Sequence, residues 1–152
     1  SNLRIYLHEG GFSSYQSEYP YEMTCKNGSI LSPTNALLDP TAEKNLIFFK
    51  NIFYLPIQET SFIYFFDIVK KKVLEKIEIK NNFLNEINVS NNLINSNIFI
   101  FSKKILGIPL YVTVKKKHIS FEHTHPPHHY ILSDDKFKQI ANLKYEINKF
   151  IT

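Results

Sequence analysis

Residues 98–132 contain the clearest alternation of hydrophobic and polar positions in the chain. Three runs within this stretch, residues 98–101, 110–114 and 119–123, are rich in β-branched and aromatic residues, which favour β-strands. The lysines at positions 115–117 separate the second run from the third, so we expect these two runs to pair as antiparallel strands. The stretch as a whole predicts a three-stranded meander.

Two other segments place their hydrophobic residues at helical spacing. Residues 60–78 predict an amphipathic helix whose apolar face holds Phe62, Phe65, Phe66, Val69, Val73 and Ile77. Ser133, Asp134 and Asp135 supply an N-cap and negative charge for the first turn of a C-terminal helix. One side of that helix presents Phe137, Ile140, Lys144, Ile147 and Ile151.

The remaining segments have weaker patterns. Residues 3–7 alternate as an opening strand that Gly10 and Gly11 end, and residues 12–40 predict a long irregular segment. Asp39 or Thr41 is a candidate helix cap, but residues 42–58 are compatible with either helix or strand. The asparagine-rich residues 81–97 predict a connection into the sheet.

These elements predict one globular domain, residues 1–152, of the α+β class. We expect an antiparallel sheet with a C-terminal three-stranded meander, packed against two or three helices including the C-terminal helix. The content of 43% hydrophobic residues argues against disorder. No apolar run reaches the roughly 20 residues that a membrane span requires, so the sequence predicts no membrane association.

The charge pattern bears on partners and compartment. The net charge of +4 comes from 17 lysines and one arginine, whereas nucleic-acid readers rely on arginine for bidentate contacts. Lysines in short runs at turns are typical of solvated turns and strand edges, which argues against a nucleic-acid partner. The single cysteine, Cys25, fits a reducing compartment, and no signal peptide is recognised, so we expect a cytoplasmic protein.

A histidine cluster follows the last predicted strand. His123 and His125 are two residues apart on an extended backbone, so they point the same way, and a buried Phe121 would place His123 on the buried side. The rigid step Pro126–Pro127 ends the strand and could bring His128 or His129 towards the other two histidines. Two interpretations stay open: a three-histidine zinc site, or structural histidines with no cofactor.

Motifs for catalysis are absent from the sequence. It contains no GxSxG, HExxH, GxGxxG or GxxxxGK pattern, and Cys25 lies in no nucleophilic context. We therefore expect no enzymatic activity. A metal-dependent hydrolase remains the alternative if the three histidines bind zinc.

Residues 119–132, ISFEHTHPPHHYIL, and the lysine-rich helix at residues 137–151 resemble the C-terminal part of bacterial immunity proteins of contact-dependent growth inhibition systems. The resemblance covers about the last third of the chain. It implies a small cytoplasmic α+β protein without catalytic activity, which binds the C-terminal domain of its cognate toxin and neutralises it. It also implies that His123 and His125 pin the strand end to the last helix, while Pro126 and Pro127 fix the turn.

Interface residues are expected in two places. Tyr15, Tyr19 and Tyr21 lie in the predicted irregular segment, and tyrosine is frequent in protein interfaces. Lys115, Lys116 and Lys117 form the predicted turn between the last two strands. These six residues are the candidate partner-binding set.

Overall fold

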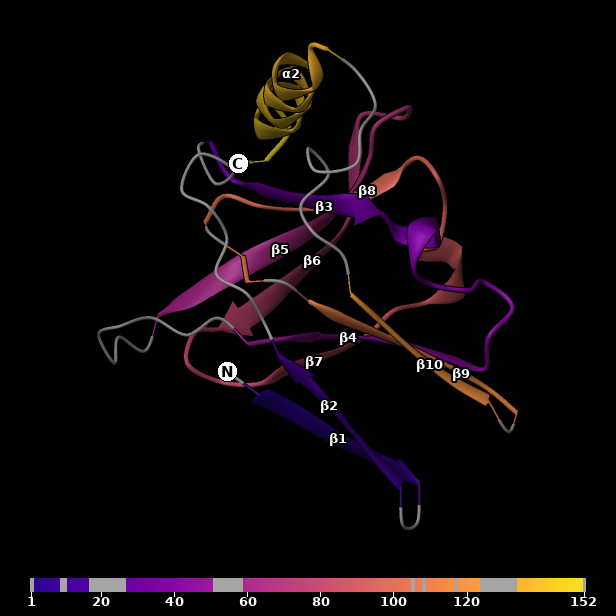
Figure 1. Ribbon diagram of the computed structural model, residues 1–152. Helices are drawn as coiled ribbons and strands as arrows, with labels where there is room; N and C mark the ends of the chain where they lie inside the picture. Colours follow the sequence, from indigo (N-terminus) through magenta and orange to yellow (C-terminus); the bar gives the residue numbers. More distant parts are fainter. Residues whose placement is uncertain are drawn as a thin grey trace.

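The computed structural model describes residues 2–8, 11–16, 27–50, 59–104, 106–107, 109–116, 118–123 and 134–151 (Figure 1). The strands are β1 (Asn2–His8), β2 (Gly11–Gln16), β3 (Ser29–Pro33), β4 (Lys44–Phe49), β5 (Thr60–Asp67), β6 (Lys72–Lys80), β7 (Asn85–Asn88), β8 (Ile98–Ser102), β9 (Leu110–Lys115) and β10 (His118–His123). Two short 3₁₀-helices, η1 (Thr34–Ala36) and η2 (Asn91–Leu93), and one α-helix, α2 (Lys136–Asn148), complete the described elements.

The strands form three antiparallel sheets. Strands β1 and β2 pair with each other. Sheet I has the order β3-β8-β5-β6, and sheet II has the order β10-β9-β4-β7. The molecule is therefore mostly β. The expectation of two or three helices is wrong for the described residues, where α2 is the one α-helix.

Residues 60–78 form the β5–β6 hairpin, so the predicted amphipathic helix is wrong. All positions from 62 to 66 are aromatic or β-branched, which favours a strand buried on both faces. Ile63 and Phe65 face sheet II, whereas Tyr64 and Phe66 face α2. A continuous apolar run of this kind also contains residues at helical spacing, and periodicity alone cannot separate the two structures.

The predicted meander is half correct. Strands β9 and β10 pair as expected, with Phe121 opposite Val112. Strand β8, however, belongs to sheet I, where it lies between β3 and β5. Its side chains are buried on both faces, because Ile100 packs between the sheets and Phe101 packs towards α2. A central strand of that kind needs a partner on each side.

The main core lies between sheets I and II. Its side chains come from both sheets and from η2 with its flanking residues, so the two sheets form a sandwich. The fully buried members are Ile47, Phe49, Ile63, Phe65, Ile79 and Ile100, and Tyr111 is 2% exposed.

Helix α2 covers the outer face of sheet I (Figure 1). It packs Ile140 and Ile147 against Tyr64, Phe66 and Phe101. The predicted C-terminal helix and its apolar side are thus confirmed, except that Phe137 is exposed. The predicted cap is not formed by a side chain, because Asp135 at the N-cap makes no capping hydrogen bond.

The outer face of sheet II carries a third apolar cluster. Leu46, Phe48, Leu110 and Val112 are buried there, and Ile119 and Phe121 pack partly against them. Sheet II therefore contributes buried side chains on both faces of β4 and β9.

The weaker sequence patterns have mixed outcomes. The opening strand is confirmed as β1, but the irregular segment expected at residues 12–40 contains part of β2 and all of β3. Of the undecided residues 42–58, positions 44–49 form β4, and residues 51–58 lie outside the described part. Within the described residues, no helix is both long and apolar enough to cross a membrane.

Candidate functional site

The last histidine of β10 lies at the edge of sheet II. His123 pairs with Leu110, so its side chain starts on the outer face together with Phe121. Phe121 is half-buried and His123 is exposed, so the condition under which His123 would start on a buried face is not met. Strand β10 is the edge strand of sheet II, and the side chain at its last position, His123, is exposed.

The zinc hypothesis concerns residues that the structure describes only in part. His125, Pro126, Pro127 and His128 lie outside the described residues. Among the residues that are described, no group of three or more His, Cys, Asp or Glu side chains could hold a metal ion. The three-histidine site and the structural role of the His-Pro segment therefore both stay predictions.

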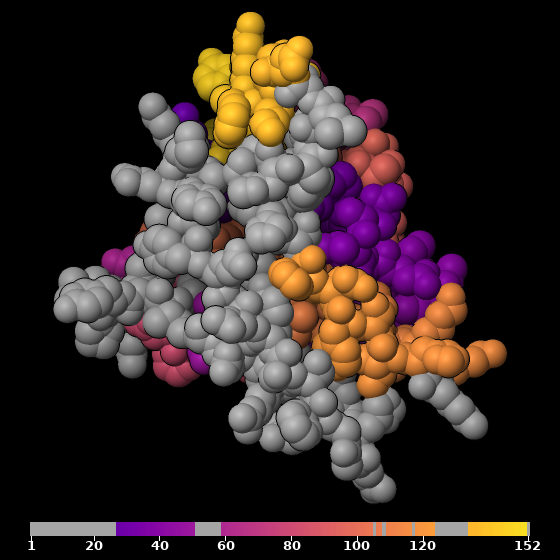
Figure 2. Space-filling view, in the orientation of Figure 1, coloured from indigo at the N-terminus to yellow at the C-terminus, as the bar shows by residue number. Residues whose placement is uncertain are grey.

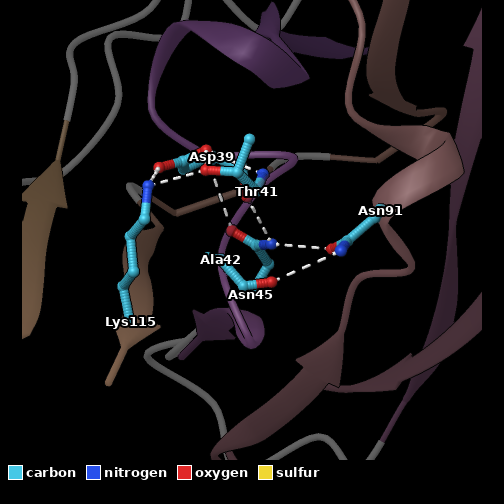
Figure 3. Close-up of polar contacts among 6 residues, drawn as sticks. All are labelled: Asp39, Thr41, Ala42, Asn45, Asn91 and Lys115. Carbon is cyan, nitrogen blue, oxygen red and sulfur yellow. Dashed lines mark hydrogen bonds and ion pairs between the residues drawn. The ribbon is translucent and has the colours of Figure 1, made fainter. Parts of the chain in front are cut away.

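A polar network joins the loop before β4 to the end of β9 (Figure 3). The carboxylate of Asp39 accepts hydrogen bonds from the N–H of Thr41 at 2.8 Å and from the Thr41 hydroxyl at 2.7 Å. The ammonium of Lys115 lies 3.2 Å from Asp39 Oδ2 and 2.7 Å from Thr41 Oγ1. These contacts form a turn, because the Asp39 side chain accepts from the backbone N–H two residues on, and β4 follows in place of the helix that Asp39 or Thr41 was a candidate to cap.

Asn45 is the buried centre of the same network. Its Nδ2 donates to the carbonyl of Asp39 at 2.9 Å and to Asn91 Oδ1 at 3.0 Å, and its Oδ1 accepts from the N–H of Asp39 at 3.2 Å. Asn91 in turn donates to the carbonyl of Ala42 at 3.3 Å. The amide groups therefore hold the loop, β4 and η2 together.

The electrostatics of this network indicate a structural role. The hydroxyl of Thr41, then its N–H and the side chain of Lys115, lower the pKa of Asp39 below its usual value of 3.8. A carboxylate held ionised by donors already in place is poorly suited to act as a general acid near neutral pH.

The structure describes three of the six predicted partner-binding residues, Tyr15, Lys115 and Lys116. Lys115 is engaged by Asp39, whereas Lys116 is exposed in the β9–β10 turn with a φ of 52°. Tyr15 lies in β2, opposite Leu3. The other members of the set, Tyr19, Tyr21 and Lys117, lie outside the described residues.

A surface that the sequence did not predict lies where α2 meets the β5–β6 turn. We call it the turn–helix surface, and its members are Val69, Lys70, Lys71, Tyr145, Lys149 and Phe150. Val69 is 67% exposed, Tyr145 65% and Phe150 42%. Phe150 reaches the outer face of sheet I, where its ring centroid lies 5.7 Å from that of Phe66. Figures 1 and 2 show α2 at one end of the molecule, away from the β9–β10 hairpin.

A buried carboxylate shapes the β5–β6 turn. Asp67 Oδ1 accepts hydrogen bonds from the N–H groups of Val69 at 3.0 Å and Lys70 at 2.9 Å. The bond from Lys70, and that from Val69, lower the pKa of Asp67 in spite of its burial. Lys71 completes the turn with a φ of 50°. The aspartate, with the lysine run 70–72 three residues on, is the sequence signal that could have revealed this turn.

The charges on this surface form one connected set. Lys149 Nζ lies 2.6 Å from Glu146 Oε1 and 4.3 Å from the centroid of the Tyr145 ring. The hydrogen bond from Lys149 lowers the pKa of Glu146, and the charges of Lys149 and Lys71 lower it further. Ile68 and Val73, on either side of the turn, pack in the same apolar cluster as Ile147 and Ile151, which places the β5–β6 turn beside the C-terminal half of α2.

Comparison with known proteins adds no relative. No protein-family model, no curated protein sequence and no solved structure matches this chain.

Proposed function

We propose that this chain is a non-catalytic immunity protein, which binds the C-terminal domain of a cognate bacterial toxin in the cytoplasm and neutralises it by covering part of its surface. The proposal combines the resemblance of residues 119–132 and the C-terminal helix with the distribution of exposed side chains. It requires no cofactor and no reacting group on the chain itself.

One structural observation carries the proposal. Of the seven large hydrophobic side chains that are exposed among the described residues, four lie on or beside α2. Three of them, Val69, Tyr145 and Phe150, belong to the turn–helix surface, and the fourth, Phe137, lies at the opposite end of α2. Exposed apolar residues gathered in one region and bordered by polar ones are typical of protein interaction sites. Such a surface suits a protein that acts by occupying another protein.

Co-expression tests the proposal. The domain encoded at the 3′ end of the neighbouring open reading frame is placed under an inducible promoter in a host strain, with or without this chain. We expect the domain to arrest growth alone and the chain to restore growth close to that of uninduced cells. The control is a toxin domain from an unrelated system, which should remain inhibitory. Growth arrest that the chain does not relieve would contradict the proposal.

A further inference from the structure

We infer that the turn–helix surface is the contact face of this chain, and that it binds an acidic protein surface with hydrophobic side chains among its carboxylates. The inference rests on the proposed function and adds to it the face that binds and the chemistry of the partner. Lysines of the β9–β10 turn were expected to contact the partner; the inference assigns this role to lysines of the β5–β6 turn.

Charge is the first argument. The turn brings Lys70, Lys71 and Lys72 to the surface, and Lys149, directly after α2, adds a fourth lysine. Within the described part of the chain, the ion pairs of these lysines involve two carboxylates: Asp67, which is buried and 3.7 Å from Lys70 Nζ, and Glu146, which is bound by Lys149. A positive excess remains on the exposed side, which complements carboxylates on a partner.

The backbone beneath the exposed side chains of the turn–helix surface is held in place by contacts within the chain. The turn is held by the two hydrogen bonds to Asp67, and Phe150 is held against Phe66. Tyr145 projects from a helix whose opposite side is anchored by Ile147, which is fully buried. A partner therefore meets apolar side chains whose backbone is already ordered, which reduces the entropic cost of binding.

The combination of aliphatic, aromatic and acidic side chains at this surface favours a protein partner over a nucleic-acid partner. Val69 is aliphatic and offers no stacking face, and Lys149 lies over one face of the Tyr145 ring. The carboxylate of Glu146 borders the surface and repels phosphate. Nucleic-acid surfaces instead combine open aromatic platforms with an unbroken run of cations.

A peptide probe tests the face directly. The ¹⁵N-labelled full-length chain is titrated with a short synthetic peptide that alternates glutamate and leucine, and its amide shifts are recorded. We expect the largest shifts at residues 69–72 and 145–150, and much smaller shifts with a matched peptide that carries lysine for glutamate. Equal shifts at the lysines of the β9–β10 turn, or no shifts at the turn–helix surface, would overturn the inference. Tighter binding of a thymidine oligonucleotide to these amides would also overturn it, in favour of nucleic acid.

Charge reversal in the toxin complex gives the second test. Lys71 and Lys116 are matched, because both are exposed turn lysines with φ values of 50° and 52°. We expect Lys71→Glu to lower the association rate constant for the neighbouring toxin domain by about tenfold at low salt, and Lys116→Glu to leave it within about twofold. Likewise, Tyr145→Ala should raise the dissociation rate, whereas Phe83→Ala, at a 48% exposed ring elsewhere, should not.

The outcomes separate the two proposals. If the wild-type chain does not bind the toxin domain, the proposed function fails, and the peptide titration alone decides on the surface. If the wild-type chain binds and neutralises the toxin domain but the Lys71 and Tyr145 variants bind like the wild type, the contact face is wrong while the function stands. Circular dichroism spectra that match the wild type show that each variant is folded.

Discussion

Gly28 occupies a position where a larger residue does not fit. Its φ is +103°, and an added Cβ would lie 2.5 Å from Phe101 Cζ and 2.6 Å from the Ser102 carbonyl oxygen. Both the backbone conformation and the contact with Phe101 oppose a side chain. We expect Gly28→Ala to lower the free energy of unfolding by about 3 kcal/mol, measured by urea denaturation.

Another positive-φ position provides the control for Gly28. Lys116→Gly relieves a left-handed conformation at an exposed turn, and the gain is offset by the flexibility of glycine in the unfolded chain. The free energy of unfolding should change by less than about 1 kcal/mol. A loss as large as that of Gly28→Ala would show that the contact with Phe101 is not the cause.

Asn45 connects the loop before β4 to η2 through a buried amide. In Asn45→Ala, the N–H and carbonyl of Asp39 and the Oδ1 of Asn91 lose the partner that Asn45 supplies, while Asn91 Nδ2 keeps its bond to Ala42. Unpaired polar groups of this kind cost about 1–3 kcal/mol. We expect a loss of about 2–3 kcal/mol in thermal or urea unfolding. Asn88→Ala, at an exposed position of the neighbouring strand β7, should cost less than about 0.5 kcal/mol.

The β5–β6 hairpin depends on one ionised carboxylate, which makes its stability dependent on pH. The folded-state pKa of Asp67 lies below the usual 3.8, so its contribution is complete above that pH and is lost as the pH falls through the lower folded value. Asp67→Asn keeps an acceptor oxygen but removes the charge. We expect the variant to be less stable than the wild type near pH 7, and the difference to shrink at about pH 3.

Urea denaturation at both pH values measures this difference. Asp39 and Glu146, whose pKa values are also lowered, are present in both proteins, so their titration cancels in the comparison. A difference between the two proteins that is independent of pH would mean that the hydrogen-bond geometry, and not the charge, makes Asp67 stabilising.

At the level of elements, the sequence predicted the local structures best. The β9–β10 hairpin is signalled by alternation on both sides of a lysine turn, and α2 by the spacing of Ile140, Ile147 and Ile151. Strand β10 and helix α2 bury one side only, so their periodicity is visible in the sequence, whereas β9 is buried on both faces and is recognised by its β-branched and aromatic residues. Strand β5 has no polar face to reveal its period, which led to the wrong prediction of a helix.

The candidate surface was harder to predict because it joins two distant segments. Val69 was assigned to a buried helix face, but the turn at Asp67 exposes it, and only the packing of α2 on sheet I brings Lys71 close to Glu146. Pairings between segments far apart in the chain leave no local pattern. The same reason explains why β8 was placed beside β9 and not between β3 and β5.

At the level of the whole molecule, these distant pairings predict slow folding. Ser29 of β3 pairs with Ser102 of β8, and Leu46 of β4 pairs with Val112 of β9. Long loops must close before such contacts form, and β-sandwiches of this kind fold in milliseconds to seconds. Stopped-flow refolding from urea should therefore give its main phase in that range. A main phase of about 10 microseconds would contradict this assembly.

The capping of the β5–β6 turn by Asp67 has a consequence for how recognition can diversify. Because a buried carboxylate and backbone amides set the course of the turn, the side chain of Val69 takes no part in shaping it, and that of Lys70 adds only an ion pair at 3.7 Å. On the proposed contact face, exchanging them would alter what the protein recognises while the scaffold stays intact. New binding preferences are thus accessible by single substitutions at these two positions, provided that the aspartate beneath them is retained.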